Sequence, residues 1–195
     1  MDVRAVTLDG EHVRLEPMLF EHLDSLTQAG AFEELWKWTN VRADSVSGMA
    51  EYVNAALDDS ARGGSLPFVT IDKQSGQVIG STRFGNIDPA NKKVEIGWTW
   101  ITPAFQRTFV NSEAKLLMLT HAFEIWECAR VELKTDVLNE KSRNAMARIG
   151  AVEEGVLRKH ILTYTGRYRD SVYYSVLDTE WPAVKERLRG LTPAR

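Results

Sequence analysis

The sequence predicts a single domain, residues 1–195, of the mixed α/β (α+β) class, with a central sheet of about seven strands and flanking helices. Three extended segments, 67–72, 77–86 and 93–101, follow one another with short turns between them. A largely apolar helical segment, 112–127, then leads to another strand-like segment, 130–137. A strand, a helix and a second strand in this order imply a right-handed parallel crossover, so the sheet should be mixed.

The N-terminal part is predicted to supply one strand and the helices of one face. Residues 13–18 are strand-like, and two polar helical stretches follow at 20–29 and 31–38. Ser47 is the expected N-cap of a further helix that ends before the Gly63-Gly64 pair. Its apolar residues recur at helical spacing and form one stripe: Met49, Tyr52, Val53, Ala56 and Leu57.

Turns and caps define the remaining elements. Turns at 73–76 and 88–91 connect the three strands into a meander. Asn111 is the expected N-cap of helix 112–127, and Asn139 that of a later helix closed by Gly150 in the left-handed conformation. The chain then continues into a hairpin and a short helix, at 152–163, 167–177 and 180–189. The predicted order is therefore β-α-α-β-β-β-α-β-α-β-β.

Composition restricts the possible partners. The 195 residues are 44% hydrophobic and 26% charged, with a net charge of −3, which gives no broad basic field to attract nucleic acid or an anionic membrane. The single cysteine, Cys128, cannot form an intrachain disulfide, and no metal-ligand spacing surrounds it. No apolar run is long enough to span a bilayer. We expect a cytoplasmic protein that binds neither nucleic acid, membrane nor metal.

The loop before helix 112–127 is the first candidate binding site. A helix that starts directly after a strand and loop exposes backbone N–H groups at the positive end of its dipole. Arg107 adds a charge, and the hydroxyls of Thr108 and Ser112 add donors. The alternative is a plain helix end that binds water. The predicted pyrophosphate cradle comprises Gln106, Arg107, Thr108, Phe109, Val110, Asn111 and Ser112.

Several sequence blocks, together with the element order, resemble the GNAT superfamily of N-acetyltransferases, specifically its RimJ/RimL-type members. The blocks are 94–100 (Val-Glu-Ile-Gly-Trp-Thr-Trp), 111–115 (Asn-Ser-Glu-Ala-Lys), 138–143 (Leu-Asn-Glu-Lys-Ser-Arg), 149–151, 169–175 and 180–181. The resemblance covers nearly the whole chain. It implies the GNAT fold and acetyl-CoA as co-substrate, without a metal. It also implies a possible homodimer, which is common in the family.

The resemblance also assigns cofactor contacts. The family's pyrophosphate loop reads Gln/Arg-x-x-Gly-x-Gly/Ala; Gln106 occupies its first position, but Phe109 and Asn111 replace the two small residues. The strand 93–101 is expected to diverge from its parallel neighbour and pair with the pantetheine arm, where a backbone N–H would polarise the thioester. This implies further contacts from Trp98, Trp100, Ile101, Asn139, Ser142 and Arg143. The last three also have structural explanations, as a helix cap, a small packed residue and a solvated charge.

Proton transfer is the least specified part of the site. Glu95, in the middle of an apolar strand, is the candidate general base, with a paired structural carboxylate as the alternative. Met146 occupies the place where many GNAT enzymes carry a general-acid tyrosine. Ser142 is the candidate substitute, and Tyr173 or Tyr174 could also serve.

The predicted acceptor is a primary amine of low pKa. An α-amine with a pKa of about 7.8 is roughly 10–15% neutral at pH 7, against about 0.04% for lysine. An enzyme with weak general acid and base groups can therefore acetylate a peptide or protein N-terminus, or a small amine, more readily than a lysine. Trp36 and Trp38 are candidate acceptor contacts, or alternatively aromatic anchors of the fold.

Two other functions fit the same sequence. The missing glycines and tyrosine suit a non-catalytic acyl-CoA-binding or regulatory domain. The other is a small-molecule detoxifying acetyltransferase acting on aminoglycoside-like or polyamine substrates, which a strongly acidic acceptor cleft would favour. Acyl transfer through Cys128 is rejected, because that thiol lies near the C-terminus of a helix, where the dipole raises its pKa.

Overall fold

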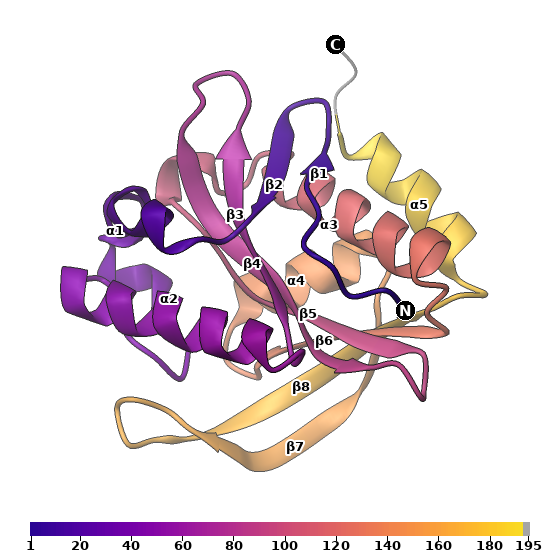
Figure 1. The fold of residues 1–195 in the computed structure, drawn as a ribbon. Coiled ribbons are helices and arrows are strands. Elements are labelled where there is room, and N and C mark those ends of the chain that lie inside the picture. The colour runs from indigo at the N-terminus through magenta and orange to yellow at the C-terminus, as the bar shows by residue number, and fades with distance from the viewer. Residues whose placement is uncertain (193–195) are drawn as a thin grey trace.

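The computed structural model describes residues 1–192 and contains one eight-stranded sheet in the order β1-β2-β3-β4-β5-β6-β8-β7 (Figure 1). All neighbouring strands are antiparallel except β5 and β6, which are parallel. The predicted crossover is therefore confirmed. The strands are β1 (Leu8–Asp9), β2 (Val13–Pro17), β3 (Leu66–Asp72), β4 (Val78–Asp88), β5 (Lys93–Ile101), β6 (Arg130–Asp136), β7 (Val152–Leu162) and β8 (Tyr168–Leu177).

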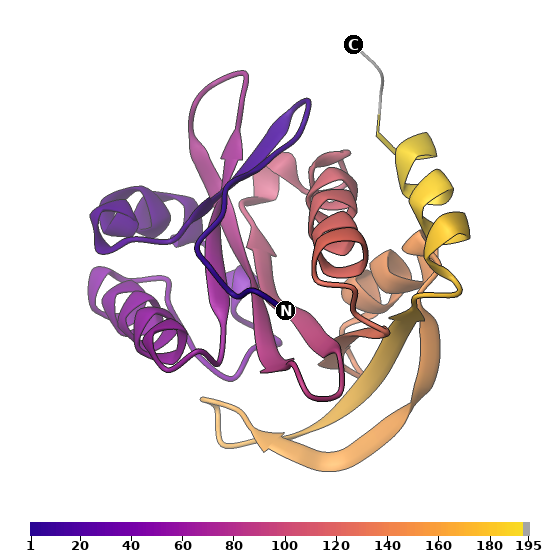
Figure 2. The same cartoon turned by 45° about the vertical axis from the view of Figure 1, so that its right-hand side comes forward.

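Helices cover both faces of the sheet (Figures 1 and 2). They are α1 (Leu23–Gly30) and α2 (Val46–Ala61) on one face, and α3 (Val110–Thr120), α4 (Glu140–Ile149) and α5 (Trp181–Gly190) on the other. Each face has its own apolar core: Trp36, Tyr52 and Trp100 belong to the first, and Phe84 and Met118 to the second. No helix in residues 1–192 combines the length and the apolarity that crossing a bilayer would need.

The predicted class and the order of the predicted elements are confirmed, with local corrections around α2. Strand β1 (Leu8–Asp9) was not predicted, so the sheet has eight strands where about seven were expected. Ser45, not Ser47, is the N-cap of α2, because Ser45 has an extended backbone and its Oγ accepts a hydrogen bond from the Gly48 N–H at 3.1 Å. The predicted helix 31–38 is only a single 3₁₀ turn, Glu33–Leu35. The chain leaves the helical path there because Trp36 turns into the core, where its indole N–H donates to the Gly30 carbonyl at 2.9 Å.

The start of α3 is also corrected. The helix begins at Val110, and its N-cap is Phe109 rather than Asn111. The Thr108 hydroxyl accepts from the Val110 N–H at 3.3 Å, so the loop satisfies this donor without asparagine. The C-terminal end continues as a π-helical turn, His121–Ile125.

The C-terminal hairpin forms one edge of the sheet. Strand β8 lies between β6 and β7, so β7 is the edge strand, and the hairpin curls across the end of the sheet below α2 (Figures 1 and 2). Val156, Leu157 and Leu162 of β7 are exposed. The homodimer implied by the resemblance stays a prediction.

Candidate active site

Strands β5 and β6 diverge in the middle of the sheet. They are paired only from Lys93–Glu95 against Arg130–Glu132, although β5 continues to Ile101 and β6 to Asp136. Within residues 1–192, positions 96–101 of β5 therefore have no strand partner on this side. Backbone N–H and C=O groups that lack a ladder partner need another one, and an extended ligand can provide it. We call this opening the splay.

A β-bulge accompanies the splay. The β4–β5 register shifts between Ser81 and Arg83, and Trp98 has a left-handed backbone, with φ of 50°. Such a bulge bends its strand and increases its twist, which turns β5 away from β6. Gly85 makes room for the displaced indole, because a Cβ there would lie 2.3 Å from Trp98 Cζ3. The absence of a side chain at Gly85 in β4 thus allows the bulge in β5 to place the Trp98 indole there.

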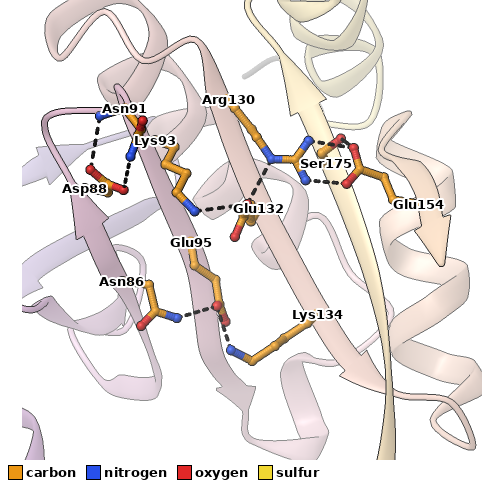
Figure 3. Close-up of polar contacts among 10 residues, drawn as sticks. All are labelled: Asn86, Asp88, Asn91, Lys93, Glu95, Arg130, Glu132, Lys134, Glu154 and Ser175. Atoms are coloured by element: carbon orange, nitrogen blue, oxygen red, sulfur yellow. Dashed lines mark hydrogen bonds and ion pairs between the residues drawn. The ribbon is translucent and has the colours of Figure 1, made fainter. Parts of the chain in front are cut away.

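Ion pairs hold the closed end of the splay together (Figure 3). Lys93 of β5 reaches Glu132 of β6 at 3.7 Å, and Arg130 contacts the same carboxylate at 2.9 Å. Arg130 also pairs with Glu154 of β7, which lowers the pKa of the Glu154 carboxyl to about 2. Strands β5, β6 and β7 are therefore connected where the β5–β6 ladder is intact, and β5 is free of β6 only beyond that point.

The loop before α3 is tied to the end of β5. The Gln106 side chain donates to the Ile101 carbonyl at 2.9 Å, which brings the N-terminus of α3 beside the open part of β5. Arg107 is exposed and has a left-handed backbone, with φ of 63°. Ser112 is buried at 1% exposure, so its hydroxyl is not displayed at the helix end.

Phe109 takes the position of a family glycine without an unusual backbone. Its φ of −69° is open to any residue, so the conformational freedom of glycine is not needed. Its ring packs against His12, with the centroids 4.7 Å apart, on the side of the β1–β2 turn. The aromatic side chain is thus directed into the protein, and the helix N-terminus keeps its unpaired N–H groups.

Glu95 is buried at 2% exposure on the α1–α2 side of β5. Its Oε2 accepts hydrogen bonds from Asn86 Nδ2 at 2.8 Å and Lys134 Nζ at 2.7 Å (Figure 3). No residue in 1–192 donates a hydrogen bond to Oε1, which lies 2.9 Å from where a Cβ on Gly97 would be. Glu95 is thus a paired carboxylate with one oxygen still available.

Arg83 lies on the same side of the sheet, and sequence reasoning missed it. It is 5% exposed, and its guanidinium stacks 5.0 Å from the ring centroids of both Tyr52 and Trp98. Lys134, also missed, lies 5.6 Å from the Trp98 ring. We call Arg83, Glu95, Trp98 and Lys134 the acceptor face. A charged residue within the otherwise buried strand β4 was the available signal for Arg83.

Both tryptophans predicted to contact the acceptor lie on this side, in different settings. Trp36 is 1% exposed and packs against Trp100, so the structure places it in the core as an aromatic anchor. Trp38 is partly exposed, and its carbonyl accepts from Arg169 of β8 at 3.3 Å. Trp38 thus connects the loop before α2 to the hairpin.

The predicted cofactor contacts after β6 serve the fold in this structure. Asn139 caps α4, as its Oδ1 accepts from the Ser142 N–H at 3.2 Å. Arg143 contacts the Tyr174 hydroxyl and Glu153, both at 3.4 Å, and so points toward β7 and β8. Tyr173 instead faces Lys134, at 5.7 Å, on the acceptor side. Of the two tyrosines, only Tyr173 adjoins the acceptor face.

Cys128 is poorly suited to nucleophilic catalysis. It is 2% exposed, and burial raises the pKa of its thiol to about 11. At neutral pH the reactive thiolate is therefore scarce. Burial of the thiol thus gives a structural reason for this inertness.

Comparisons with known proteins agree with this geometry. Residues 12–152 match the Acetyltransferase (GNAT) domain family. The chain is 39% identical over 110 residues to "Putative ribosomal N-acetyltransferase YdaF" of Bacillus subtilis (strain 168), a match spanning 56% of this chain and 59% of the relative. A GCN5-related N-acetyltransferase from Brucella melitensis superimposes with a TM-score of 0.89 and 33% identity, covering 97% of this chain and 87% of that one.

A more distant structure shares the fold. Mycobacterium smegmatis RimJ, solved in complex with CoA-disulfide, has a TM-score of 0.77 and 22% identity over 91% of this chain and 88% of its own. The splayed parallel strands, the helix N-terminus beside them and the family match together confirm the resemblance seen in the sequence. The chain belongs to the GNAT family of acetyltransferases.

Proposed function

We propose that the chain transfers the acetyl group of acetyl-CoA to an α-amine, either a peptide or protein N-terminus or a small amine of similar pKa. The splay carries this proposal, because the open backbone of residues 96–101 ends beside the N-terminus of α3. An extended pantetheine arm can pair with such an open strand. Its pyrophosphate would meet unpaired N–H groups, the helix dipole and Arg107.

The amine attacks the thioester directly in a ternary complex. The C–N bond forms, the C–S bond breaks, one amine proton leaves and the departing thiolate takes up a proton. Glu95 receives the amine proton through Oε1, directly or through water. Ser142 or Tyr173 supplies the proton for the thiolate. A backbone N–H of the bulged part of β5 stabilises the oxyanion.

The charges of the acceptor face support a low-pKa amine. Lys134 and Arg83 place two positive charges near Glu95, and nearby positive charge favours the neutral, nucleophilic form of an amine. The same charges disfavour polyamine or aminoglycoside acceptors, which carry several positive charges. The name of one relative, "Putative ribosomal N-acetyltransferase YdaF", is consistent with a protein N-terminus as acceptor.

The direct test is release of free CoA thiol from acetyl-CoA. The panel contains peptides with free N-termini, N-terminally blocked lysine peptides and small amines, with calorimetric titration of acetyl-CoA alongside. We expect binding and thiol release with α-amines, and little with lysine side chains. Absence of acetyl-CoA binding would refute the proposal, and binding without turnover on any acceptor would support the regulatory alternative.

Two loop substitutions test the predicted pyrophosphate cradle. Arg107→Gly should weaken acetyl-CoA binding roughly 10-fold through loss of a charged contact, although glycine suits the left-handed backbone better than arginine does. Phe109→Gly should leave the affinity within about threefold, since the ring faces His12. Calorimetric dissociation constants measure both. Tighter binding by the Phe109→Gly variant by tenfold or more would contradict this loop geometry.

A further inference from the structure

We propose that Arg83 binds a carboxylate of the acceptor, so that the substrate is a molecule carrying a carboxylate close to its reacting amine. The inference rests on the proposed function and specifies its substrate class. Two sources share this chemistry. One is a peptide whose first residue is acidic, and the other is a free amino acid with its α-carboxylate.

Arg83 is a buried cation without an anion. It is 5% exposed, and no ion pair or hydrogen bond of its guanidinium occurs within residues 1–192. Its Nε is fully buried and has no hydrogen-bond partner in the described part of the chain. A buried charge normally pairs with an opposite charge, since removing it from water is costly. An anionic ligand would supply the partner that the protein itself does not.

The guanidinium is held ready for such a ligand. It contacts the Tyr52 and Trp98 rings, each with its centroid at 5.0 Å. The Tyr52 hydroxyl bonds to Ser81 Oγ at 3.2 Å and donates to the Trp98 carbonyl at 3.3 Å, which fixes the first ring. Gly85 leaves space for the second. A guanidinium stacked on rings keeps its N–H edge free for the two-pronged contact that a carboxylate prefers.

The position relative to Glu95 matches an amine and a carboxylate on one small unit. Arg83 is opposite Gly97 in the β4–β5 ladder, and Glu95 is opposite Gly85, so Arg83 and Glu95 are diagonal neighbours on one side of the sheet. Diagonal neighbours lie roughly 7–8 Å apart in the backbone, with their Cβ atoms somewhat closer. An acceptor could thus present its amine to Glu95 and its carboxylate to Arg83.

The other positive charges near Arg83 already have partners within the described protein. Lys134 is already paired with Glu95 at 2.7 Å, so these two charges balance. Arg169 of β8, also buried, donates to Ser171 Oγ at 2.9 Å and to the Trp38 carbonyl at 3.3 Å. Unlike the buried Arg169 and the paired Lys134, Arg83 thus has hydrogen-bonding groups that the described protein does not use.

The experiment compares acceptors that differ only in the carboxylate. Peptides beginning with Asp or Glu are matched with peptides beginning with Asn or Gln, and free amino acids with their amides. In one of the two sets, peptides or free amino acids, we expect the carboxylate-bearing acceptor to have a kcat/KM roughly 10- to 100-fold higher than its neutral partner. The set that shows this preference identifies whether the carboxylate comes from a peptide or from a free amino acid. Calorimetric titration of the same pairs into the CoA-bound protein measures the preference without turnover.

Arg83→Met should abolish this preference, and Arg83→Lys should retain only part of it, since lysine keeps the charge but not the fork. Arg148→Met, at an exposed arginine of α4, is the matched control. Acetyl-CoA affinity should be unchanged in all three variants, which separates this proposal from the acetyltransferase proposal itself. Equal kcat/KM and equal affinity for both members of every pair, or an unchanged preference in Arg83→Met, would overturn the assignment.

Discussion

Replacing Glu95 with Gln should lower kcat for an α-amine acceptor roughly 100- to 10,000-fold, while acetyl-CoA affinity stays within about threefold. The amide keeps the shape of the side chain and can still accept from Asn86 or Lys134, but it cannot take a proton. The defect should shrink above pH 8 to 9, where an amine of pKa about 7.8 is already neutral. Steady-state kinetics over a pH series measures both effects.

A purely structural role for Glu95 predicts a different pattern. Glu95→Gln leaves the Lys134 ammonium without its anion, and so disturbs the site through that charge. Lys134→Met removes the other partner, and the double variant removes both charges. If only the ion pair matters, the double variant should recover activity. If Glu95 is the base, the double variant should remain as inactive as Glu95→Gln, although its thermal stability recovers.

The fold could be predicted because each element carries a local signal that the tertiary structure does not override. The strand at Lys93–Ile101 and the helix between Asn139 and Gly150 have the boundaries expected from strand propensity, an N-cap and a left-handed glycine. Three predictions missed: Ser47 and Asn111 as N-caps, and residues 31–38 as a helix. The two caps are displaced by two residues, and the third miss depends on a tertiary contact. The burial of Trp36 redirects that segment, and no local pattern encodes it.

The candidate site was only partly predictable. Glu95 and the α3 loop became candidates because a carboxylate in an apolar strand and a strand–loop–helix junction are visible in the sequence; their roles stay predictions. Arg83, Tyr52 and Lys134 were not, because they belong to three different elements, β4, α2 and β6. Their meeting around Trp98 depends on the bulge in β5. Cross-strand register, which local periodicity does not fix, decides which side chains share a face.

Lys115→Met should stabilise the protein at neutral pH by roughly 2–4 kcal/mol. Lys115 is buried in α3, where it has no ion pair in the described chain, and burial lowers the pKa of its ammonium from 10.5 to about 7. Its one hydrogen bond goes to Thr99 Oγ1 at 3.0 Å. Losing that bond costs about 1 kcal/mol, because Thr99 keeps Thr82 as a partner at 2.7 Å. Methionine has a similar length and no charge to desolvate.

The pH dependence identifies the cause of this stabilisation. The unfolded chain holds the Lys115 proton up to pH 10.5, whereas the folded chain releases it near pH 7. Between these values the unfolded state binds more protons, so this group makes the wild type more stable as the pH rises. The gain in the free energy of unfolding from Lys115→Met should therefore be largest below pH 7 and should decrease toward pH 10.5. Chemical denaturation of both proteins across this range measures it, and a constant difference would exclude charge burial as the cause.

The activity of the Lys115→Met variant then shows why a costly lysine is present. Its Nζ binds Thr99, which follows Trp98 in the bulge of β5. Residues that reduce stability without a packing reason are expected where function requires them. Lower kcat in a more stable variant would indicate that Lys115 positions the β5 backbone that meets the thioester. Unchanged kcat would show that this bulge keeps its catalytic geometry without the Lys115–Thr99 contact.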